Sequence, residues 1–142
     1  MAFPQTFRAY QYENYGSLET ELKINSTVPQ KPIGAQQVRI KVHSAAIDPV
    51  DYLLQGFLGK QVLGKSPSLE NSFGIGFDAS GEIVKVGGEV KSLNIGDELY
   101  AMAPCSAFGT LAEYVLVDEE FVSAKPTSLS FDEAAAIPLS LD

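Results

Sequence analysis

Residues 37–56 read QVRIKVHSAAIDPVDYLLQG, and this stretch decides the fold. Side chains alternate between two faces through residues 37–47, which is the period of a half-buried β-strand. One face carries Val38, Ile40, Val42 and Ser44, and the other carries Arg39, Lys41 and His43. Asp48 and Pro49 then indicate a helix start, because aspartate caps a first turn and proline fits its first position. The stretch therefore predicts a strand followed at once by a short helix that ends near Gly56.

Turn-forming residues divide the rest of the chain into short elements. Twelve glycines and eight prolines are spread through the 142 residues, which favours brief strands joined by turns. The further strands that we expect cover residues 8–13, 20–25, 80–86, 98–103, 111–117 and 121–124. Residues 59–73 have little periodicity, and we expect a surface loop there. Many short strands and only two short helices predict a mainly-β barrel or sandwich.

The second helix is predicted near the end of the sequence. Ser130 and Glu133 fit a capping box, in which each side chain accepts from the other residue's backbone N–H, and Pro138 ends the helix. A helix of about two turns is marginal unless it packs on something. We therefore expect either that it docks on the barrel or that the chain is cut from a longer protein. Residues 1–129 are then the main domain, and residues 130–142 begin a connecting helix.

The composition argues against several classes of function. At 45% hydrophobic and 20% charged, the chain is globular rather than disordered. Ten basic and eighteen acidic residues give a net charge of −8, which disfavours nucleic acid or an anionic membrane surface as a partner. The first residues show no secretory signal, and no apolar run approaches about 18 residues. We therefore expect a cytoplasmic protein.

His43 and Cys105 are candidates for metal or nucleophile chemistry. They are the single histidine and the single cysteine of the sequence, whereas a zinc site needs three or four protein ligands. A single cysteine also excludes an internal disulfide framework. His43 falls on the polar face of its strand, which predicts a solvated side chain, and Cys105 is expected to be a free, inert thiol. A nucleophilic Cys–His pair stays open, although no third orienting group is identifiable.

Residues 74–79, GIGFDA, contain two glycines spaced as in a phosphate-binding turn. The dinucleotide fingerprint G-x-G-x-x-G needs a third glycine and a helix directly after it. Here alanine occupies the sixth position, and a strand is expected to follow. We therefore interpret the segment as a tight turn, in which glycine provides a positive φ or a close backbone approach.

Five motifs follow one another along the chain. They are residues 46–51 (AIDPVD), 76–84 (GFDASGEIV), 87–97 (GGEVKSLNIGD), 109–115 (GTLAEYV) and 132–138 (DEAAAIP). They are similar, in the same order, to the patterns A-x-N-P-x-D, P-G-x-D-x-S-G-x-V, G-x-x-V-x-x-F-x-x-G-D, G-x-x-A-E-Y and E-A-A-x-x-P. The chain therefore resembles the quinone-oxidoreductase branch of the medium-chain dehydrogenase/reductase superfamily.

Two positions depart from the patterns of this family. Asp48 stands where the family usually has asparagine, and an ionised aspartate cannot donate a hydrogen bond as an amide can. Ile75 stands where the family has proline, which affects the rigidity of the turn more than its chemistry.

The resemblance implies a mainly-β fold, a GroES-like and partly open β-barrel with short helices. Such a barrel is the catalytic lobe of a two-domain reductase that uses NADPH or NADH, held mainly by a Rossmann domain that this chain lacks. Zinc alcohol dehydrogenases of the superfamily have cysteine at the position of Asp48 and histidine at that of Phe77, so the zinc-independent branch is implied. Its substrates would be quinones or α,β-unsaturated carbonyls. A homo-oligomer stays open, and this chain alone is expected to be inactive.

The resemblance also assigns roles to residues near the first helix. Tyr52 and Asp48 are the expected catalytic residues, because a phenol can donate or orient a proton. The expected substrate contacts are Asp51, Phe77 and Met102, and the expected cofactor contacts are Asp48, Pro49 and Val50. Simpler roles compete with these assignments: the aspartates can stabilise the helix start, and the aromatic rings can belong to the core.

A second class of function is not enzymatic: a stand-alone GroES-like module for interaction or self-association. A surface that normally meets a second domain would expose apolar side chains, and such patches promote association. The short length favours this module, whereas the five motifs favour the dehydrogenase. Cofactor binding and native mass distinguish the two.

We predict that the folded chain carries no zinc, because His43 and Cys105 alone cannot supply the three or four ligands of a zinc site. Elemental analysis of protein purified without a metal-affinity tag measures this directly. One tightly held zinc per chain would contradict the zinc-independent assignment.

Overall fold

The computed structural model describes residues 3–56, 58–104 and 109–138. The strands are β1 (Thr6–Tyr12), β2 (Lys23–Pro29), β3 (Gln37–Ala46), β4 (Phe73–Gly74), β5 (Asp78–Val86), β6 (Glu98–Met102), β7 (Tyr114–Asp118) and β8 (Val122–Ala124). The helices are α1 (Leu18–Glu21), α2 (Pro49–Gln55), α3 (Gly59–Leu63) and α4 (Phe131–Ala135), with a 3-10 turn η1 (Glu119–Phe121). None of these described helices is long and apolar enough to cross a bilayer.

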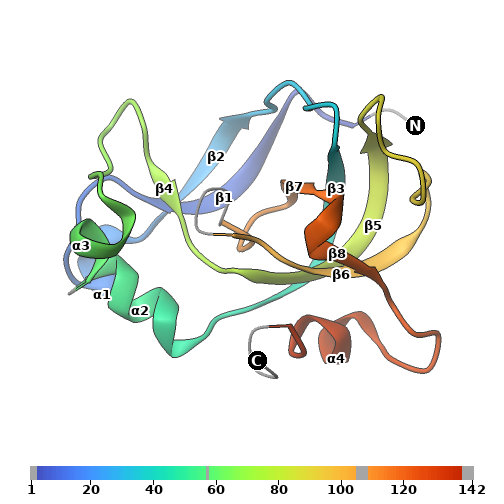
Figure 1. The fold of residues 1–142 in the computed structure, drawn as a ribbon. Helices are drawn as coiled ribbons and strands as arrows, with labels where there is room; N and C mark the ends of the chain where they lie inside the picture. The colour runs from blue at the N-terminus through green and yellow to red at the C-terminus, as the bar shows by residue number, and fades with distance from the viewer. Residues whose placement is uncertain (1–2, 57, 105–108, 139–142) are drawn as a thin grey trace.

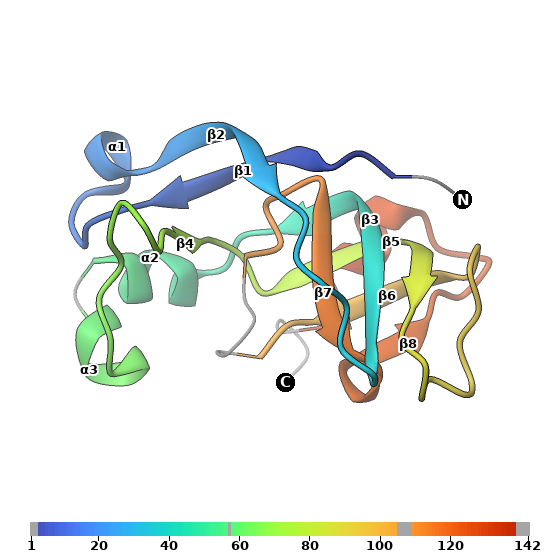
Figure 2. The same cartoon turned by 90° about the horizontal axis from the view of Figure 1, so that it is seen from above.

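The strands form two antiparallel sheets. The smaller sheet has the order β2-β1-β4, and the larger has the order β7-β3-β5-β6-β8. Among the described residues, a bridge joins Ala9 of β1 to Ala112, which precedes β7, and the two sheets make a barrel that stays partly open. Helices α1, α2 and α3 gather at one end of the molecule (Figures 1 and 2), and α4 packs against the larger sheet. The expected mainly-β, partly open barrel is confirmed.

The alternation in β3 explains the core of the barrel. Val38 and Ile40 are fully buried, and Ile40 pairs with the fully buried Ile83 of β5. The central apolar cluster consists of Val38, Ile40, Ile83, Leu99, Ala101, Ala103 and Val117. Burying a side chain of the Val, Leu or Ile type stabilises a fold by about 1.5–3 kcal/mol. The larger sheet therefore provides the rigid frame on which the loops at its edges are held.

Gly81 lies at a close approach between β3 and β5. It pairs with Val42, beside a register shift between Val42 and Ser44. A β-carbon on Gly81 would lie 2.1 Å from the backbone oxygen of Lys41 and 3.1 Å from the Ile40 side chain. A residue without a side chain is required at such an approach, and glycine is common where a ladder is irregular.

Two local predictions from the sequence are wrong. Residues 59–73, expected as a loop, contain α3 and β4, and Gly59 packs so closely on the Tyr15 ring that a β-carbon would lie 2.2 Å from it. The second strand begins at Lys23, because Ser17 accepts from the backbone N–H of Glu19 at 3.3 Å and starts a helical turn. The helix at residues 59–63 and the later start of the second strand both depend on contacts that an alternating hydrophobic pattern does not reveal.

The polar face of β3 is not uniformly solvated. Arg39 is 2% exposed, donates to the backbone oxygen of Lys31 and lies 4.4 Å from the centre of the Phe3 ring. Burial lowers the pKa of this guanidinium. The expected exposure of this face is therefore wrong for Arg39, because the N-terminal segment covers it. His43 is partly exposed, and its ring stacks on Phe131 with centroids 4.1 Å apart.

We predict that Gly81→Ala lowers the free energy of unfolding by about 3 kcal/mol or more, because backbone on both sides resists the new methyl group. Gly88→Ala is the matched control: a β-carbon there meets no atom within 4 Å, so its effect should stay within about 1 kcal/mol. Urea unfolding followed by circular dichroism compares the two variants. Equal stabilities would show that β3 and β5 can separate at Gly81.

Candidate functional site

The ends of three neighbouring strands meet at one edge of the larger sheet. The register pairs Ala46 of β3 with Asp78 of β5, and Asp78 with Met102 of β6. The backbone oxygen of Phe77 accepts from Ala103 at 2.6 Å. The loop that starts α2, the turn before β5 and the end of β6 therefore lie together. This edge gathers segments that carry the expected site residues.

Asp48 and Pro49 start α2 as the sequence predicts. Asp48 has an extended backbone, Pro49 is the first helical residue, and the Asp48 and Asp51 side chains form a capping box. Gly56 ends the helix. The helix start is therefore fixed by local chemistry, directly after the last residue of β3 that pairs with β5.

Asp51 joins this helix start to the glycine turn. Its side chain is 2% exposed. One carboxylate oxygen accepts from the backbone N–H of Asp48 at 2.9 Å, and the other accepts from Gly76 at 2.7 Å. Burial raises the pKa of Asp51, while these two hydrogen bonds oppose the rise. One buried carboxyl group therefore connects two segments that are 25 residues apart in the sequence.

The glycine turn is held from its other side by residues 109–111. Gly76 has φ of 98°, and its oxygen accepts from Gly109 at 2.8 Å and from Thr110 at 3.1 Å. The Thr110 hydroxyl donates to the oxygen of Asp78 at 2.9 Å. A β-carbon on Gly76 would lie 2.4 Å from that hydroxyl. The interpretation as a tight turn is confirmed, since strand β5 follows it and the Gly76 N–H is already bonded to Asp51.

The expected site residues differ widely in exposure. Tyr52 is 63% exposed on α2, whereas Phe77 is 5% exposed and Asp51 is 2% exposed. Asp48, Val50 and Met102 are half-buried, and Pro49 is exposed. The Tyr52 side chain is therefore accessible from solvent. Phe77 and Asp51 are placed to support the edge from within.

Sequence patterns missed two residues that build this edge. Thr110 is 1% exposed and bonds the turn. Tyr12, on β1, is 2% exposed, and its pKa is raised by burial and then by Tyr15 and Asp51. No local sequence pattern predicts that Thr110 bonds the glycine turn or that Tyr12 is buried near Asp51. Their positions follow from the pairing of distant segments.

Two hollows of the described surface are not lined by the expected catalytic residues. One of about 380 Å³ includes Phe7, Val28, Phe73 and Tyr114 in its lining, and one of about 320 Å³ includes Tyr10, His43 and Leu111. Neither is lined by Asp48, Tyr52, Phe77 or Met102.

The residues that the structure describes contain no group of three or more His, Cys, Asp or Glu side chains that could hold a metal ion. His43 lies 3.6 Å from the carboxylate of Glu82. Cys105 lies outside the described residues, so the structure does not test whether it meets His43.

We predict that Asp51→Ala lowers the free energy of unfolding by about 2–5 kcal/mol, because two backbone donors lose their acceptor. Asp51→Asn keeps one acceptor oxygen and should cost less. Urea unfolding of both variants and the parent measures the effect. A loss below that of an ordinary surface substitution would show that Asp51 does not hold the turn.

The same variants test the raised pKa. Between the ordinary pKa of 3.8 and the raised pKa of folded Asp51, the unfolded chain loses this proton first. Ionisation of Asp51 therefore reduces the stability of the parent as the pH rises through that window. Asp51→Asn has no such proton, so its stability relative to the parent should improve over the same rise. A difference that does not change with pH would contradict the effect of burial.

Comparisons with known proteins agree with this architecture. The family model described as alcohol dehydrogenase GroES-like domain matches residues 34–127. A 2-methylene-furan-3-one reductase of Solanum lycopersicum is 39% identical over 150 residues, which cover 100% of this chain and 37% of that protein. An NADPH-dependent alkenal/one oxidoreductase, chloroplastic, of Arabidopsis thaliana is 36% identical, with 99% of this chain and 36% of that protein covered. The chain thus spans little more than a third of these relatives.

A solved structure shares the fold. The quinone oxidoreductase from Coxiella burnetii superposes with a TM-score of 0.81 at 33% identity, covering 94% of this chain and 41% of that one. The chain therefore belongs to the alcohol dehydrogenase GroES-like domain family, within the quinone-oxidoreductase-like medium-chain dehydrogenases/reductases.

Proposed function

We propose that this chain is the substrate-binding lobe of a zinc-independent, NAD(P)H-dependent oxidoreductase that reduces quinones or α,β-unsaturated carbonyls. The observation that carries the proposal is the junction of the α2 start, the Phe77 turn and the end of β6 at one sheet edge. The Solanum and Arabidopsis relatives, which by name reduce a furanone and alkenals or enones, support this substrate class.

Tyr52 is the proposed hydrogen-bond donor to the substrate carbonyl. Its side chain is 63% exposed, while the first turn of its helix is fixed through Asp51. A phenol can donate a hydrogen bond to a carbonyl oxygen and supply a proton to it. Exposure and a fixed backbone together suit a group that must meet an incoming molecule in one orientation.

Asp48 is proposed to lie beside the substrate and the nicotinamide end of the cofactor. Its side chain is half-buried at the start of α2, next to the exposed Pro49 and the half-buried Val50. A carboxylate here accepts hydrogen bonds, for example from an amide N–H. Asp51 is assigned a different role from the one expected: it positions this segment from within and is too buried to line an open substrate site.

Phe77 and Met102 are proposed to form the apolar base of the edge. Phe77 is 5% exposed and Met102 is half-buried. A flat ring held by Tyr52 would contact Met102, while the buried Phe77 would support that surface from within.

The cofactor fits this chain only in part. A pyrophosphate normally lies on free backbone N–H groups of a glycine-rich turn that opens a helix. Here the Gly76 N–H is bonded to Asp51, and a strand follows the turn. We therefore propose that a Rossmann domain outside this chain holds most of the nucleotide, and that the chain alone neither binds NAD(P)H measurably nor catalyses reduction. A reduced nicotinamide, when bound, supplies the hydride.

The competing function is a GroES-like module that associates with itself or another protein. Exposed apolar side chains around α2 favour it: Ile47, Tyr52, Leu53 and Val62 are 40–63% exposed. Exposed apolar side chains that gather into one patch mark an interface. The same surface suits a cleft shared with a second domain. The cytoplasmic location expected from the sequence stays a prediction, and the Arabidopsis relative is chloroplastic by name.

We predict that Tyr52→Phe, in the protein that joins this chain to a nucleotide-binding domain, lowers kcat/KM for a small quinone with NADPH by about tenfold to hundredfold. Asp48→Asn keeps a capping side chain but changes the charge beside the substrate, so it should also change kcat/KM. Both melting temperatures should stay within about 2 °C of the parent.

Leu53→Ala is the matched control, because Leu53 is a neighbouring exposed residue of α2 without a polar group. It should leave kcat/KM within about threefold of the parent value. If Tyr52→Phe and Asp48→Asn both melt and turn over like the parent, the α2 start is scaffold and the assigned roles are wrong.

A further inference from the structure

The Lys125 side chain is an unusual cation in this acidic chain. It directly follows β8, and only 6% of the side chain is exposed. A buried ammonium group is unfavourable unless each of its protons has an acceptor and its charge is compensated. The groups around the Lys125 ammonium group must therefore supply these acceptors and a compensating charge.

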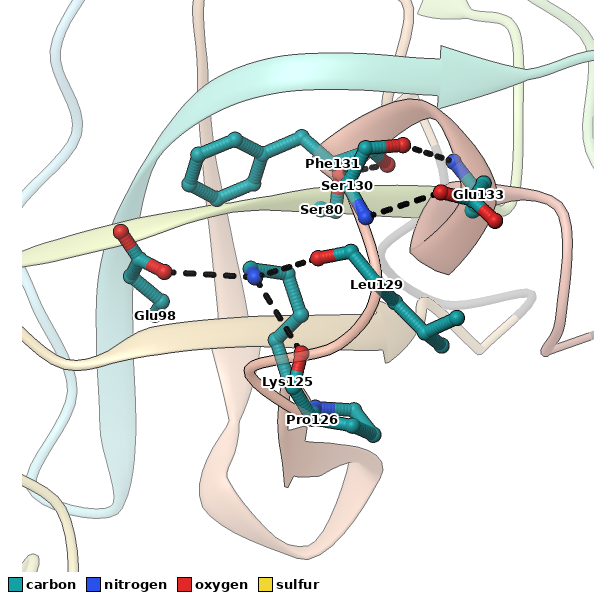
Figure 3. A network of polar contacts seen from close by, with 8 residues as sticks. All are labelled: Ser80, Glu98, Lys125, Pro126, Leu129, Ser130, Phe131 and Glu133. Carbon is teal, nitrogen blue, oxygen red and sulfur yellow. Dashed lines mark hydrogen bonds and ion pairs between the residues drawn. The ribbon is translucent and has the colours of Figure 1, made fainter.

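All three ammonium protons have an acceptor within reach. The Lys125 nitrogen lies 2.7 Å from the Leu129 oxygen, 3.3 Å from the Pro126 oxygen and 3.3 Å from a carboxylate oxygen of Glu98. Figure 3 shows these contacts converging on one nitrogen. The Phe131 ring centre lies 5.1 Å away, within the range of a cation–π contact. Because an ammonium group has three donors, this set uses all of them.

Two of these acceptors belong to the turn that leads to α4. The Leu129 N–H also bonds to the Pro126 oxygen at 3.1 Å, which closes the turn. The carbonyl oxygens of Pro126 and Leu129 thus point toward one cation. Without it, two carbonyl dipoles and a carboxylate would face one another.

Helix α4 depends on anchors of this kind. It has five residues, too few for stability on its own. Ser130 and Glu133 form its capping box, with hydrogen bonds of 3.1 and 3.2 Å (Figure 3). The Ser80 hydroxyl of β5 donates to the Phe131 oxygen at 2.5 Å. The backbone N–H of Lys125 donates to the backbone oxygen of Glu98 in β6 at 3.0 Å, so its side chain links the turn before α4 to this strand. Helix α4 is thus held on strands β5 and β6.

We propose that Lys125 is a positioning residue: its ammonium group acts as a built-in cation that organises the turn at residues 126–129 and holds α4 on the sheet. Strands β5 and β6 begin and end beside Phe77 and Met102, so the position of α4 bears on the same sheet edge. This inference does not rest on the proposed reductase function, since its readouts are measured on the chain itself.

An ordinary ion pair with Glu98 would not have this effect. The Glu98 side chain is 53% exposed, and exposed ion pairs contribute little. The carbonyl oxygens make the difference: Glu98→Gln leaves them bound, whereas Lys125→Met leaves them without a cation. The two variants should therefore differ.

Hydrogen exchange of the Glu133 and Ala134 amides, which bond to Ser130, measures how firmly α4 is held. Lys125→Met should speed their exchange by about tenfold or more relative to the core amide of Ile83. Glu98→Gln should have a smaller effect. Lys91→Met, a change at an exposed lysine, should have none. Equal exchange in Lys125→Met and Lys91→Met, or equal effects of Lys125→Met and Glu98→Gln, would overturn the proposal.

Chemical rescue separates a cation site from simple packing. Lys125→Ala leaves room for a small ammonium ion, so methylammonium should restore slow exchange of the Glu133 and Ala134 amides. Tetramethylammonium, which has no N–H donor, should not. The Lys125→Arg variant should also show fast exchange of the Glu133 and Ala134 amides, because a planar guanidinium cannot direct three donors to the same acceptors. Equal effects of the two ions would assign the rescue to salt and overturn the proposal.

A measurement on the parent chain applies even if the variants do not fold. The ammonium protons of Lys125 should be protected from exchange in ¹H–¹⁵N NMR spectra and show couplings across hydrogen bonds to the carbonyl carbons of Pro126 and Leu129. Lys91 should show neither. Ammonium protons of Lys125 that exchange as fast as those of Lys91 would contradict the proposal.

Discussion

The candidate site depends on the buried carboxyl group of Asp51. A carboxylate removed from water is destabilised unless donors replace the lost hydration. Here the N–H groups of Asp48 and Gly76 do so, one from its own helix start and one from a turn before β5. The direction of the pKa shift shows that burial outweighs these hydrogen bonds. A single side chain therefore links the geometry of the α2 start to that of the glycine turn.

The sheet register determines what this carboxyl group can connect. Because Ala46, Asp78 and Met102 lie across adjacent strands, the segments that follow β3, precede β5 and follow β6 open on the same side. Glycines at 76 and 81 allow the close approaches that this pairing needs. Tyr52 is exposed on α2, and the first turn of this helix is bonded to the glycine turn through Asp51. The proposed substrate site therefore depends on the strand register, which positions the glycine turn, and on the turn, which is bonded to the helix that carries Tyr52.

Two buried cations away from the site also connect separate segments of the chain. In a chain of net charge −8, the described cations Arg39 and Lys125 are both largely buried and both bind backbone carbonyl oxygens. Arg39 holds the segment that precedes β3, and Lys125 holds the turn that precedes α4. These two cationic side chains bind loop carbonyl oxygens, and a charged donor makes a stronger hydrogen bond than a neutral one.

The sequence alone determined the features that are set by neighbours along the chain. Alternation in β3, the Asp48–Pro49 helix start and the Ser130–Glu133 capping box agree with the structure, since their causes lie within a few residues. The glycine turn at residues 74–76 was also predicted, although its hydrogen-bond partners lie far away in the sequence. The ordered motifs also identified the family. Tertiary structure decided the rest: the burial of Arg39, the helix at Gly59–Leu63 and the roles of Thr110, Asp51 and Lys125. Asp51, Thr110 and Gly59 meet partners that lie 25 or more residues away in the sequence, and contacts across such distances leave no periodic pattern. Lys125 binds carbonyl oxygens close by in the sequence, but nothing in its neighbours predicts that its side chain is buried.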